Sequence, residues 1–251
     1  MTTERLINLI LLFFTYAFLG WCIEVTLKYF QFHRFINRGF LTGPWLPIYG
    51  SGAVMITVVI EGLAPLEFSV GTTFIVSFLL CGVLEYMTSY VLEKRFHARW
   101  WDYSQKPMNL HGRVWIGNLI LFGLGGVVIV ELINPLLLRL SEHVSLTVRE
   151  IMALSLTTIF IADNVMSHFV LKLVKTGVES SKADKTEAIS KEVRLLLSNR
   201  SVFYRRFAEA YPEVIFKTER ITKRMEEIRV ETERLRQEAE ERVAQMRLEV
   251  A

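Results

Sequence analysis

The sequence predicts an all-α protein: a polytopic membrane bundle of five transmembrane helices, followed by a long charged cytoplasmic helical tail. Three observations support this fold class. Hydrophobic residues make up 51% of the 251 residues, which is high for a soluble domain. They are concentrated in long runs before residue 176, whereas the remainder of the chain is rich in charge. The basic residues between the runs alternate in number, as successive membrane crossings require. We therefore expect a transmembrane domain at 1–176 and a charged helical tail at 177–251.

Five apolar runs are close to the length that a membrane-spanning helix needs, about 20 residues. The first run lacks an Ala-x-Ala cleavage site and continues past any plausible cleavage point, so we expect it to be retained as a span. The second run is short. The predicted spans are 6–29, 47–63, 70–92, 114–138 and 151–174.

The basic residues in the connections predict the orientation, because short loops rich in Lys and Arg stay in the cytoplasm. The first and third connections and the start of the tail are basic, whereas the second connection has no Lys or Arg. This alternation favours five spans over an even number, with the N-terminus outside and the C-terminus in the cytoplasm. The basic residues are Lys28, Arg34 and Arg38 in the first connection, Lys94, Arg95, Arg99, Lys106 and Arg113 in the third, Arg139 and Arg149 in the fourth, and Lys172 and Lys175 at the tail.

The most polar stretch of the first 176 residues is 99–113, between the third and fourth spans. Its Trp and Tyr side chains favour the headgroup level of a membrane, which predicts an ordered interfacial loop that closes one end of the bundle. The first connection, at 33–50, contains Gly39, Gly43 and Pro44, which prevent a regular helix there. Both loops are predicted to be cytoplasmic, so they can meet.

Ionisable side chains inside the spans are candidates for function, because a charge at mid-membrane costs roughly 2.5–3.5 kcal/mol on insertion scales. Glu24 and Glu85 lie in the cytoplasmic halves of their spans, and Asp163 lies near the middle of the fifth. Two interpretations stay open. In the structural one, Glu24 and Glu85 accept hydrogen bonds from Arg38, Arg113 or loop N–H groups and lock the bundle. In the functional one, they line a polar cavity that opens to the cytoplasm and binds a headgroup, an ion or a polar solute.

Several classes of chemistry are not supported. Cys22 and Cys81 are isolated thiols inside apolar runs and form neither a disulfide framework nor a metal site. No His pair or His/Cys cluster has metal-ligand spacing, so we predict no metal and no cofactor. Walker A and Gly-x-Ser-x-Gly motifs are absent, so the chain is not itself an ATPase, and no catalytic residue is assigned. A net charge of +3 without a nucleic-acid signature argues against nucleic-acid binding.

The tail carries basic and acidic residues in similar numbers. From Ile221 its apolar residues recur at spacings of four and three, but Thr232 and Arg242 occupy expected seam positions, so the heptad pattern is weak. We predict a long cytoplasmic helix that is either solvated or weakly paired, through self-association or docking on a partner.

Five separated segments carry a resemblance to a known family: 20–24, 37–50, 84–86, 101–104 and 109–113. In this order they resemble the family called "putative ABC-transporter type IV", the CmpB-like bacterial membrane proteins, over about residues 8–176. The resemblance implies a multi-pass protein of the bacterial inner (plasma) membrane, named as a permease. The family often has Asn-x-Asn-Gly-Arg where this chain has Asn109-Leu-His-Gly-Arg113, so His111 departs from the pattern.

The likeness to the family, position by position, points to a set of side chains that either form a polar site or lock the loops together. It also includes Gly43 and Pro44. The candidate side chains are Glu24, Arg38, Tyr49, Glu85, Trp101, Asp102, Tyr103, Asn109 and Arg113.

Three functional hypotheses follow. The first is an ABC-transporter permease-like subunit that works in the bilayer with a separate ATPase subunit, its substrate unknown. The second is a membrane scaffold or regulatory protein that recruits partners, or forms a homo-oligomer, through its cytoplasmic helix. The third is an intramembrane enzyme that acts on lipid or envelope precursors, for which Glu85, Asp102 and Arg113 would carry turnover.

Overall fold

The computed structural model describes residues 2–39, 41–63, 69–96, 98–180, 215–216 and 234. Its helices are α1 (Thr3–Phe32), α2 (Pro47–Leu63), α3 (Val70–Phe96), α4 (Ile116–Val128), α5 (Asn134–Glu142) and α6 (Leu146–Ser180), with a π-helical turn, η2 (Ile129–Ile133). Its two-residue strands are β1 (Ala98–Arg99), β2 (Asn109–Leu110), β3 (Val114–Trp115) and β4 (Ile215–Phe216). Because α4, η2 and α5 form one continuous helix, the described residues contain five helices, and the fold is all-α.

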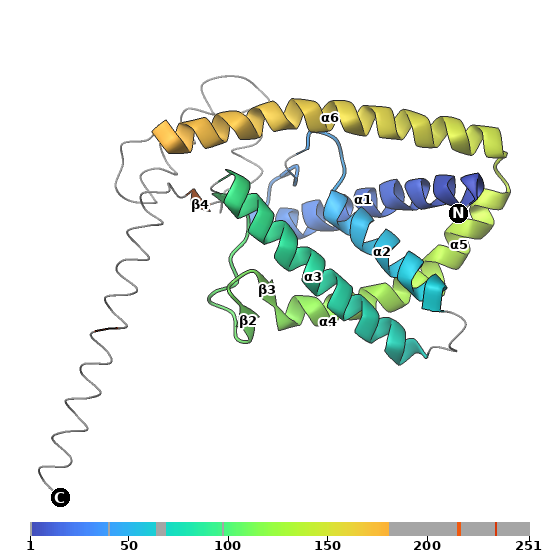
Figure 1. Cartoon of the computed structure of the whole chain (residues 1–251), viewed down its shortest axis with the longest axis horizontal. Coiled ribbons are helices and arrows are strands. Elements are labelled where there is room, and N and C mark those ends of the chain that lie inside the picture. The colour runs from blue at the N-terminus through green and yellow to red at the C-terminus, as the bar shows by residue number, and fades with distance from the viewer. Residues whose placement is uncertain are drawn as a thin grey trace, which may run out of the picture.

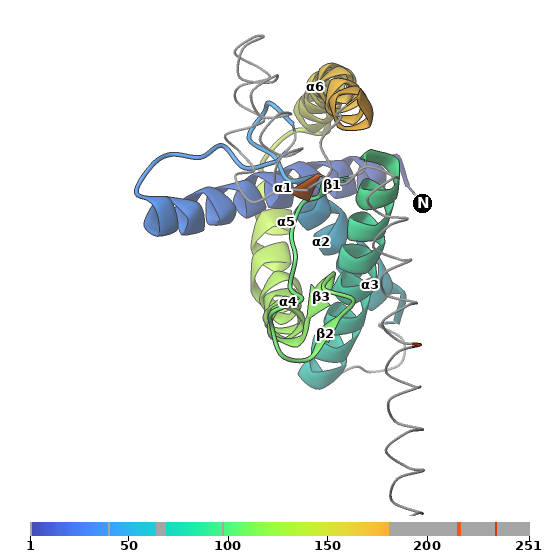
Figure 2. The same cartoon turned by 90° about the vertical axis from the view of Figure 1, so that its left-hand side faces the viewer.

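Successive helices run in alternating directions (Figure 1). Helices α1, α3 and α6 run one way, and α2 and the α4–α5 helix run the other way. The connection between α1 and α2 and the connection between α3 and α4 therefore lie at the same end of the bundle, on the left in Figure 1. Figure 2, in which α6 is seen nearly end-on, shows α1 between α6 and the remaining helices. The two polar loops thus share one end of the molecule.

Three helices are long and apolar enough to cross a membrane: Thr3–Phe32, Val70–Arg95 and the continuous helix Ile116–Glu142. The apolar helix α2 is shorter, with 17 residues, and α6 is not among these three. The surfaces of the three helices carry many exposed large apolar side chains, which suit contact with lipid rather than water. Examples are Phe18, Ile23, Leu27, Leu79, Val83, Leu121 and Leu124. The chain is therefore an integral membrane protein, and the predicted crossings by α2 and α6 stay predictions.

The helix bounds follow the apolar runs closely, with one correction. The predicted fourth span, 114–138, is wrong at its beginning, because Val114 and Trp115 pair with β2 and the helix begins at Ile116. The same helix contains the turn η2 immediately before Asn134 and Pro135. Proline has no N–H and its ring collides with the carbonyl four residues earlier, so the helix widens before this residue.

The predicted boundary between 176 and 177 lies inside α6, which continues to Ser180. Most of the predicted tail, including the weak heptad pattern from Ile221, lies outside the described residues. Within it, β4 pairs antiparallel with β1, so that Ala98 is opposite Phe216 and Arg99 is opposite Ile215. The two-part division and the helical tail stay predictions.

Aromatic packing joins α1, the first loop and α6. The buried residues Phe14, Ala17, Leu41 and Trp45 form one cluster, and Phe160 of α6 packs against it. The ring of Phe160 makes edge contacts with Phe14 and Trp45 at centroid distances of 5.6 and 6.0 Å. This cluster holds the first loop in place beside the helices that carry the candidate residues.

Candidate functional site

The connection between α3 and α4 is an ordered loop, as predicted, built on the hairpin of β2 and β3. In the hairpin Asn109 is opposite Trp115. The Asn109 amide donates to the carbonyls of Lys106 and Ser104 at 2.7 and 3.3 Å, and its oxygen accepts from the Gly112 N–H at 2.8 Å. One candidate side chain thus satisfies three backbone groups that the turn leaves unpaired. The role of Asn109 in this structure is to shape the loop.

Backbone and indole hydrogen bonds fix the rest of this loop. Trp101 Nε1 donates to the Arg113 carbonyl at 2.8 Å, and the Tyr103 N–H donates to the Gly112 carbonyl at 2.8 Å. Gly112 has φ of 66°, and a Cβ there would collide with an Asp102 carboxylate oxygen. Glycine is needed at this position both for its backbone conformation and for the close approach of Asp102.

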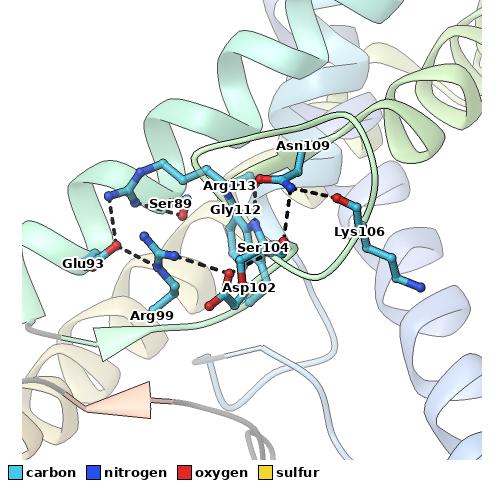
Figure 3. Close-up of polar contacts among 10 residues, drawn as sticks. Ser89, Glu93, Arg99, Asp102, Ser104, Lys106, Asn109, Gly112 and Arg113 are labelled. Carbon is cyan, nitrogen blue, oxygen red and sulfur yellow. Dashed lines mark hydrogen bonds and ion pairs between the residues drawn. The ribbon is translucent and has the colours of Figure 1, made fainter. Parts of the chain in front are cut away.

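The charged side chains beside the hairpin form a group that we name the loop network: Glu93, Arg99, Asp102 and Arg113 (Figure 3). Glu93 Oε2 lies 3.0 Å from Arg99 Nε and 2.9 Å from Arg113 Nη2. Arg99 also contacts Asp102 at 3.3 Å. Glu93, Arg99 and Arg113 are half-buried and Asp102 is exposed, so water screens their charges only in part. Two carboxylates and two guanidinium groups therefore balance one another.

Arg113 fastens the loop to α3. Beyond its ion pair with Glu93, it donates to Ser89 Oγ at 3.2 Å. Its guanidinium lies over the rings of Tyr86 and Tyr90, 5.8 and 5.5 Å from their centroids, at cation–π distance. The structural interpretation had named Arg113 as a donor to the acids inside the spans. In the described residues Arg113 pairs with Glu93 at the end of α3 instead.

A second group, which we name the interior cluster, lies where the two loops meet the helices: Glu24, Arg38, Tyr49, Glu85, Tyr103 and Asn118. Tyr49 of α2 donates its hydroxyl to Glu24 of α1 at 2.9 Å, and Arg38 of the first loop lies 3.6 Å from the same carboxylate. Gly20 allows this approach, because a Cβ there would overlap the Tyr49 ring. Glu24 thus forms an ion pair with Arg38, one of the partners that the structural interpretation names, and the locking role itself stays a prediction.

Glu85 is the buried acid of the interior cluster, with 5% of its surface exposed. Its Oε1 accepts from the Tyr103 hydroxyl and from the Asn118 amide, each at 3.4 Å. Asn118 also donates to the Tyr103 hydroxyl at 2.7 Å. The other carboxylate oxygen of Glu85, Oε2, is buried and has no hydrogen-bond partner in the described residues. In the described residues the hydrogen bonds to Glu85 therefore come from Tyr103 and Asn118, and not from the Arg38, Arg113 or loop N–H groups that the structural interpretation names.

Each acid of the interior cluster accepts a hydrogen bond from a tyrosine hydroxyl, Glu24 from Tyr49 and Glu85 from Tyr103. Burial raises the pKa of the Tyr103 phenol above its ordinary value, and the charge of Glu85 raises it further. Tyr103 therefore keeps its proton at neutral pH and acts as a hydrogen-bond donor to the Glu85 carboxylate.

Asp163 of α6 holds the first loop. Its carboxylate accepts from the N–H of Thr42 at 2.8 Å, from the N–H of Gly43 at 2.7 Å and from Trp45 Nε1 at 2.8 Å. Three short hydrogen bonds to one carboxylate compensate its charge well. Asp163 is thus a clamp on the loop, a role that its isolated position in an apolar run did not specify.

Sequence reasoning missed several functional or structural partners. Asn118 and Glu93 complete the interior cluster and the loop network, but each is an ordinary polar residue near a helix end. A further buried network was also missed: Tyr16 donates to Asn134 at 2.6 Å, and Asn134 donates to Thr57 at 2.8 Å. A polar residue beside Pro135 in an apolar run was the one available signal for that network.

The candidate side chains therefore divide between two sites. Glu24, Arg38, Tyr49, Glu85 and Tyr103 belong to the interior cluster, and the others shape or fasten the second loop. Across the part of the chain that the structure describes, no group of three or more His, Cys, Asp or Glu residues could hold a metal ion. Of the three residues in the third hypothesis, Asp102 and Arg113 are engaged in ion pairs of the loop network, and Glu85 lies in the interior cluster.

Comparison with known proteins agrees with the resemblance noted in the sequence. Residues 11–168 match the model of the family described as "Putative ABC-transporter type IV". No curated protein and no solved structure matches the chain. The match spans more than half of the chain and includes both polar loops and the helices that carry the interior cluster. The chain belongs to the putative ABC-transporter type IV family of membrane proteins.

Proposed function

We propose that this chain is a permease-like integral membrane subunit of an ABC transporter, and that the interior cluster is its polar site, reached from the cytoplasm. The family supports a transport role, and the absence of a Walker A motif assigns ATP hydrolysis to a separate subunit. The observation that carries the proposal is the composition of the interior cluster. It draws side chains from four helices and both loops into one place, where movement of either loop would alter it.

The proposed topology has five spans, with the N-terminus outside and the C-terminus in the cytoplasm of a bacterial inner membrane. The alternating directions of the five helices support it, as does the gathering of both basic loops at one end (Figure 1). Under the positive-inside rule that end is cytoplasmic. The interior cluster then lies at the cytoplasmic mouth of the bundle, and Glu61 and Arg5, at the other end, face outwards.

The test is affinity purification of the full chain in a mild detergent or a nanodisc, followed by mass spectrometry of the proteins that co-purify. A stoichiometric ATPase is the expected result. Tyr49→Phe, which alters the interior cluster, should retain the ATPase and impair uptake or export once a substrate is identified. A homo-oligomer without an ATPase would overturn the permease proposal.

One observation favours a second function, a membrane scaffold that works through its tail. Strand β4 of the tail pairs with β1, directly beside Arg99 of the loop network. A tail attached in this way could transmit partner binding to the loop, or hold an oligomer together. Removal of residues 177–251 distinguishes the two functions: a scaffold loses its partner or its oligomer and keeps a folded bundle, whereas a permease keeps its ATPase.

A further inference from the structure

We propose that the interior cluster binds a single monovalent cation at Glu85, either an alkali metal ion or the ammonium group of a solute. This inference rests on the proposed function, since it names the class of ligand that the polar site would take. It starts from a carboxylate oxygen that is buried without a hydrogen-bond partner in the described residues. Glu85 Oε2 has no hydrogen-bond partner in the described residues, and the residue is 5% exposed.

Within the described residues the charges of the interior cluster do not balance. The interior cluster contains the carboxylates of Glu24 and Glu85 and one guanidinium, that of Arg38, which pairs with Glu24. The guanidinium groups of Arg99 and Arg113 are held by Glu93 of the loop network. A buried carboxylate is costly in free energy unless it is paired, so one added positive charge would balance this cluster.

The atoms near Glu85 are suited to a small cation. Its two hydrogen bonds are long, 3.4 Å each, and come from neutral groups. The carboxylate oxygens of Glu85 and the Tyr103 hydroxyl are hard oxygen donors of the kind that alkali ions take. One unpaired unit of charge matches a monovalent ion better than a divalent one, which needs several carboxylates.

A second buried atom without a hydrogen-bond partner distinguishes the two candidate ligands, an alkali metal ion and the ammonium group of a solute. Trp115 Nε1 is buried and makes no hydrogen bond in the described residues, and its ring lies 6.5 Å from the Tyr103 ring, centroid to centroid. A metal ion cannot accept a hydrogen bond from an N–H group. A solute that carries both an ammonium group and a hydrogen-bond acceptor could use Glu85 and Trp115 together.

The experiment measures thermal unfolding of the purified full chain in nanodiscs. NaCl, KCl and methylammonium chloride are each exchanged for N-methylglucamine chloride at constant ionic strength and pH. The zwitterion glycine is added to N-methylglucamine chloride at the same ionic strength and pH. We expect a saturable rise in melting temperature with at least one of them. Glu85→Gln keeps an acceptor for Tyr103 and Asn118. It should raise the concentration of the compound that gives half of the rise in melting temperature by at least about tenfold.

Glu61→Gln is the matched control, because Glu61 pairs with Arg5 at the opposite end of the bundle and is well exposed. It should respond as the unaltered chain does. Trp115→Phe should weaken the response to glycine and leave the response to NaCl or KCl unchanged. If Glu85→Gln fails to fold, Tyr103→Phe, which removes one oxygen ligand, is measured in its place and should also weaken the response.

Three results would overturn the proposal: equal melting temperatures in all the salts, a rise that persists in Glu85→Gln, or stabilisation by acid alone, which would mean that Glu85 takes a proton. The measurement uses the isolated chain, so it is independent of any ATPase. A chain that binds a cation but co-purifies with no ATPase would refute the permease proposal alone. A chain that co-purifies with an ATPase but binds no cation would refute the cation site alone.

Discussion

The loop network and the interior cluster lie at the same end of the bundle and both contain carboxylates and arginine, yet their charges are arranged differently. In the loop network Glu93 is within 3.0 Å of two guanidinium groups, and Asp102 is 3.3 Å from Arg99. In the interior cluster Glu24 has one guanidinium partner, Arg38, at 3.6 Å, and Glu85 has two long hydrogen bonds from neutral groups.

This difference indicates that the loop network holds structural elements together, whereas the interior cluster is suited to bind a ligand. A balanced group of charges holds its elements together and offers nothing to a ligand, because each charge already has a partner. An unbalanced group keeps part of its carboxylate charge uncompensated. A bound cation would pair with that charge and so offset the unfavourable free energy of burying it. Both groups contain residues that resemble the family pattern, so the pattern alone cannot assign their roles.

The largest effect should come from the balanced group. Glu93→Gln leaves Arg99 and Arg113 half-buried without a carboxylate between them, and we expect a loss of about 2–3 kcal/mol in the free energy of unfolding, between the values for exposed and buried pairs. Thermal unfolding in detergent measures it. The control Glu61→Gln breaks an exposed ion pair and should cost less than about 1 kcal/mol. Equal effects of the two variants would show that the loop network fastens nothing.

The clamp at Asp163 should give the next largest effect, because it resembles the loop network in having its charge well compensated. Asp163→Asn removes the negative charge and leaves one acceptor oxygen for Thr42, Gly43 and Trp45, so we expect a loss of about 1–2 kcal/mol. Hydrogen exchange at the amides of Thr42 and Gly43 should become faster. Asn164→Ala on the same helix removes only a local bond to the Phe160 carbonyl and should leave these amides protected.

Much of the fold could be predicted from the sequence, because helix position depends on local information. Runs of apolar residues gave the helix bounds, and Lys and Arg counts predicted that the two polar loops share an end. The beginning of the fourth helix could not be predicted, because Val114 and Trp115 are as apolar as the residues that follow. Only their pairing with β2 excludes them from the helix.

The division of the candidate residues between two sites could not be predicted either. Glu85 and Glu93 lie on the same helix, about 12 Å apart along its axis at 1.5 Å per residue. Which of them meets Arg113 depends on the path of the loop, and that path is set by Asn109 and by backbone groups. The loop partners of Asp163 are hidden for the same reason, because two of the three loop donors to its carboxylate are backbone N–H groups, which every residue type except proline provides.

A smaller effect, of opposite sign, is expected in the unbalanced group. Glu85→Gln removes a buried charge that has no ion-pair partner and keeps an acceptor for Tyr103 and Asn118. Without an added cation we expect it to gain about 1 kcal/mol in stability, as replacements of poorly paired buried charges often do. Thermal unfolding in N-methylglucamine chloride measures this gain. A loss as large as that of Glu93→Gln would mean that Glu85 is a fastening residue and would remove the contrast between the two groups.

The smallest effect concerns the turn that joins the two groups. His111 has φ of 53°, in the left-handed region, where Asn and His occur more often than most other residues. The resemblance implies Asn at this position, and Asn shares this conformational preference with His. His111→Asn should therefore change the free energy of unfolding by no more than about 0.5 kcal/mol, although it removes the 3.0 Å contact between His111 Nδ1 and the Tyr86 hydroxyl. His111→Val is the comparison, since a β-branched residue is strained at positive φ and should cost at least about 1 kcal/mol. If His111→Asn proves as harmful as His111→Val, the contact with Tyr86, and not the backbone, decides which residue this turn accepts.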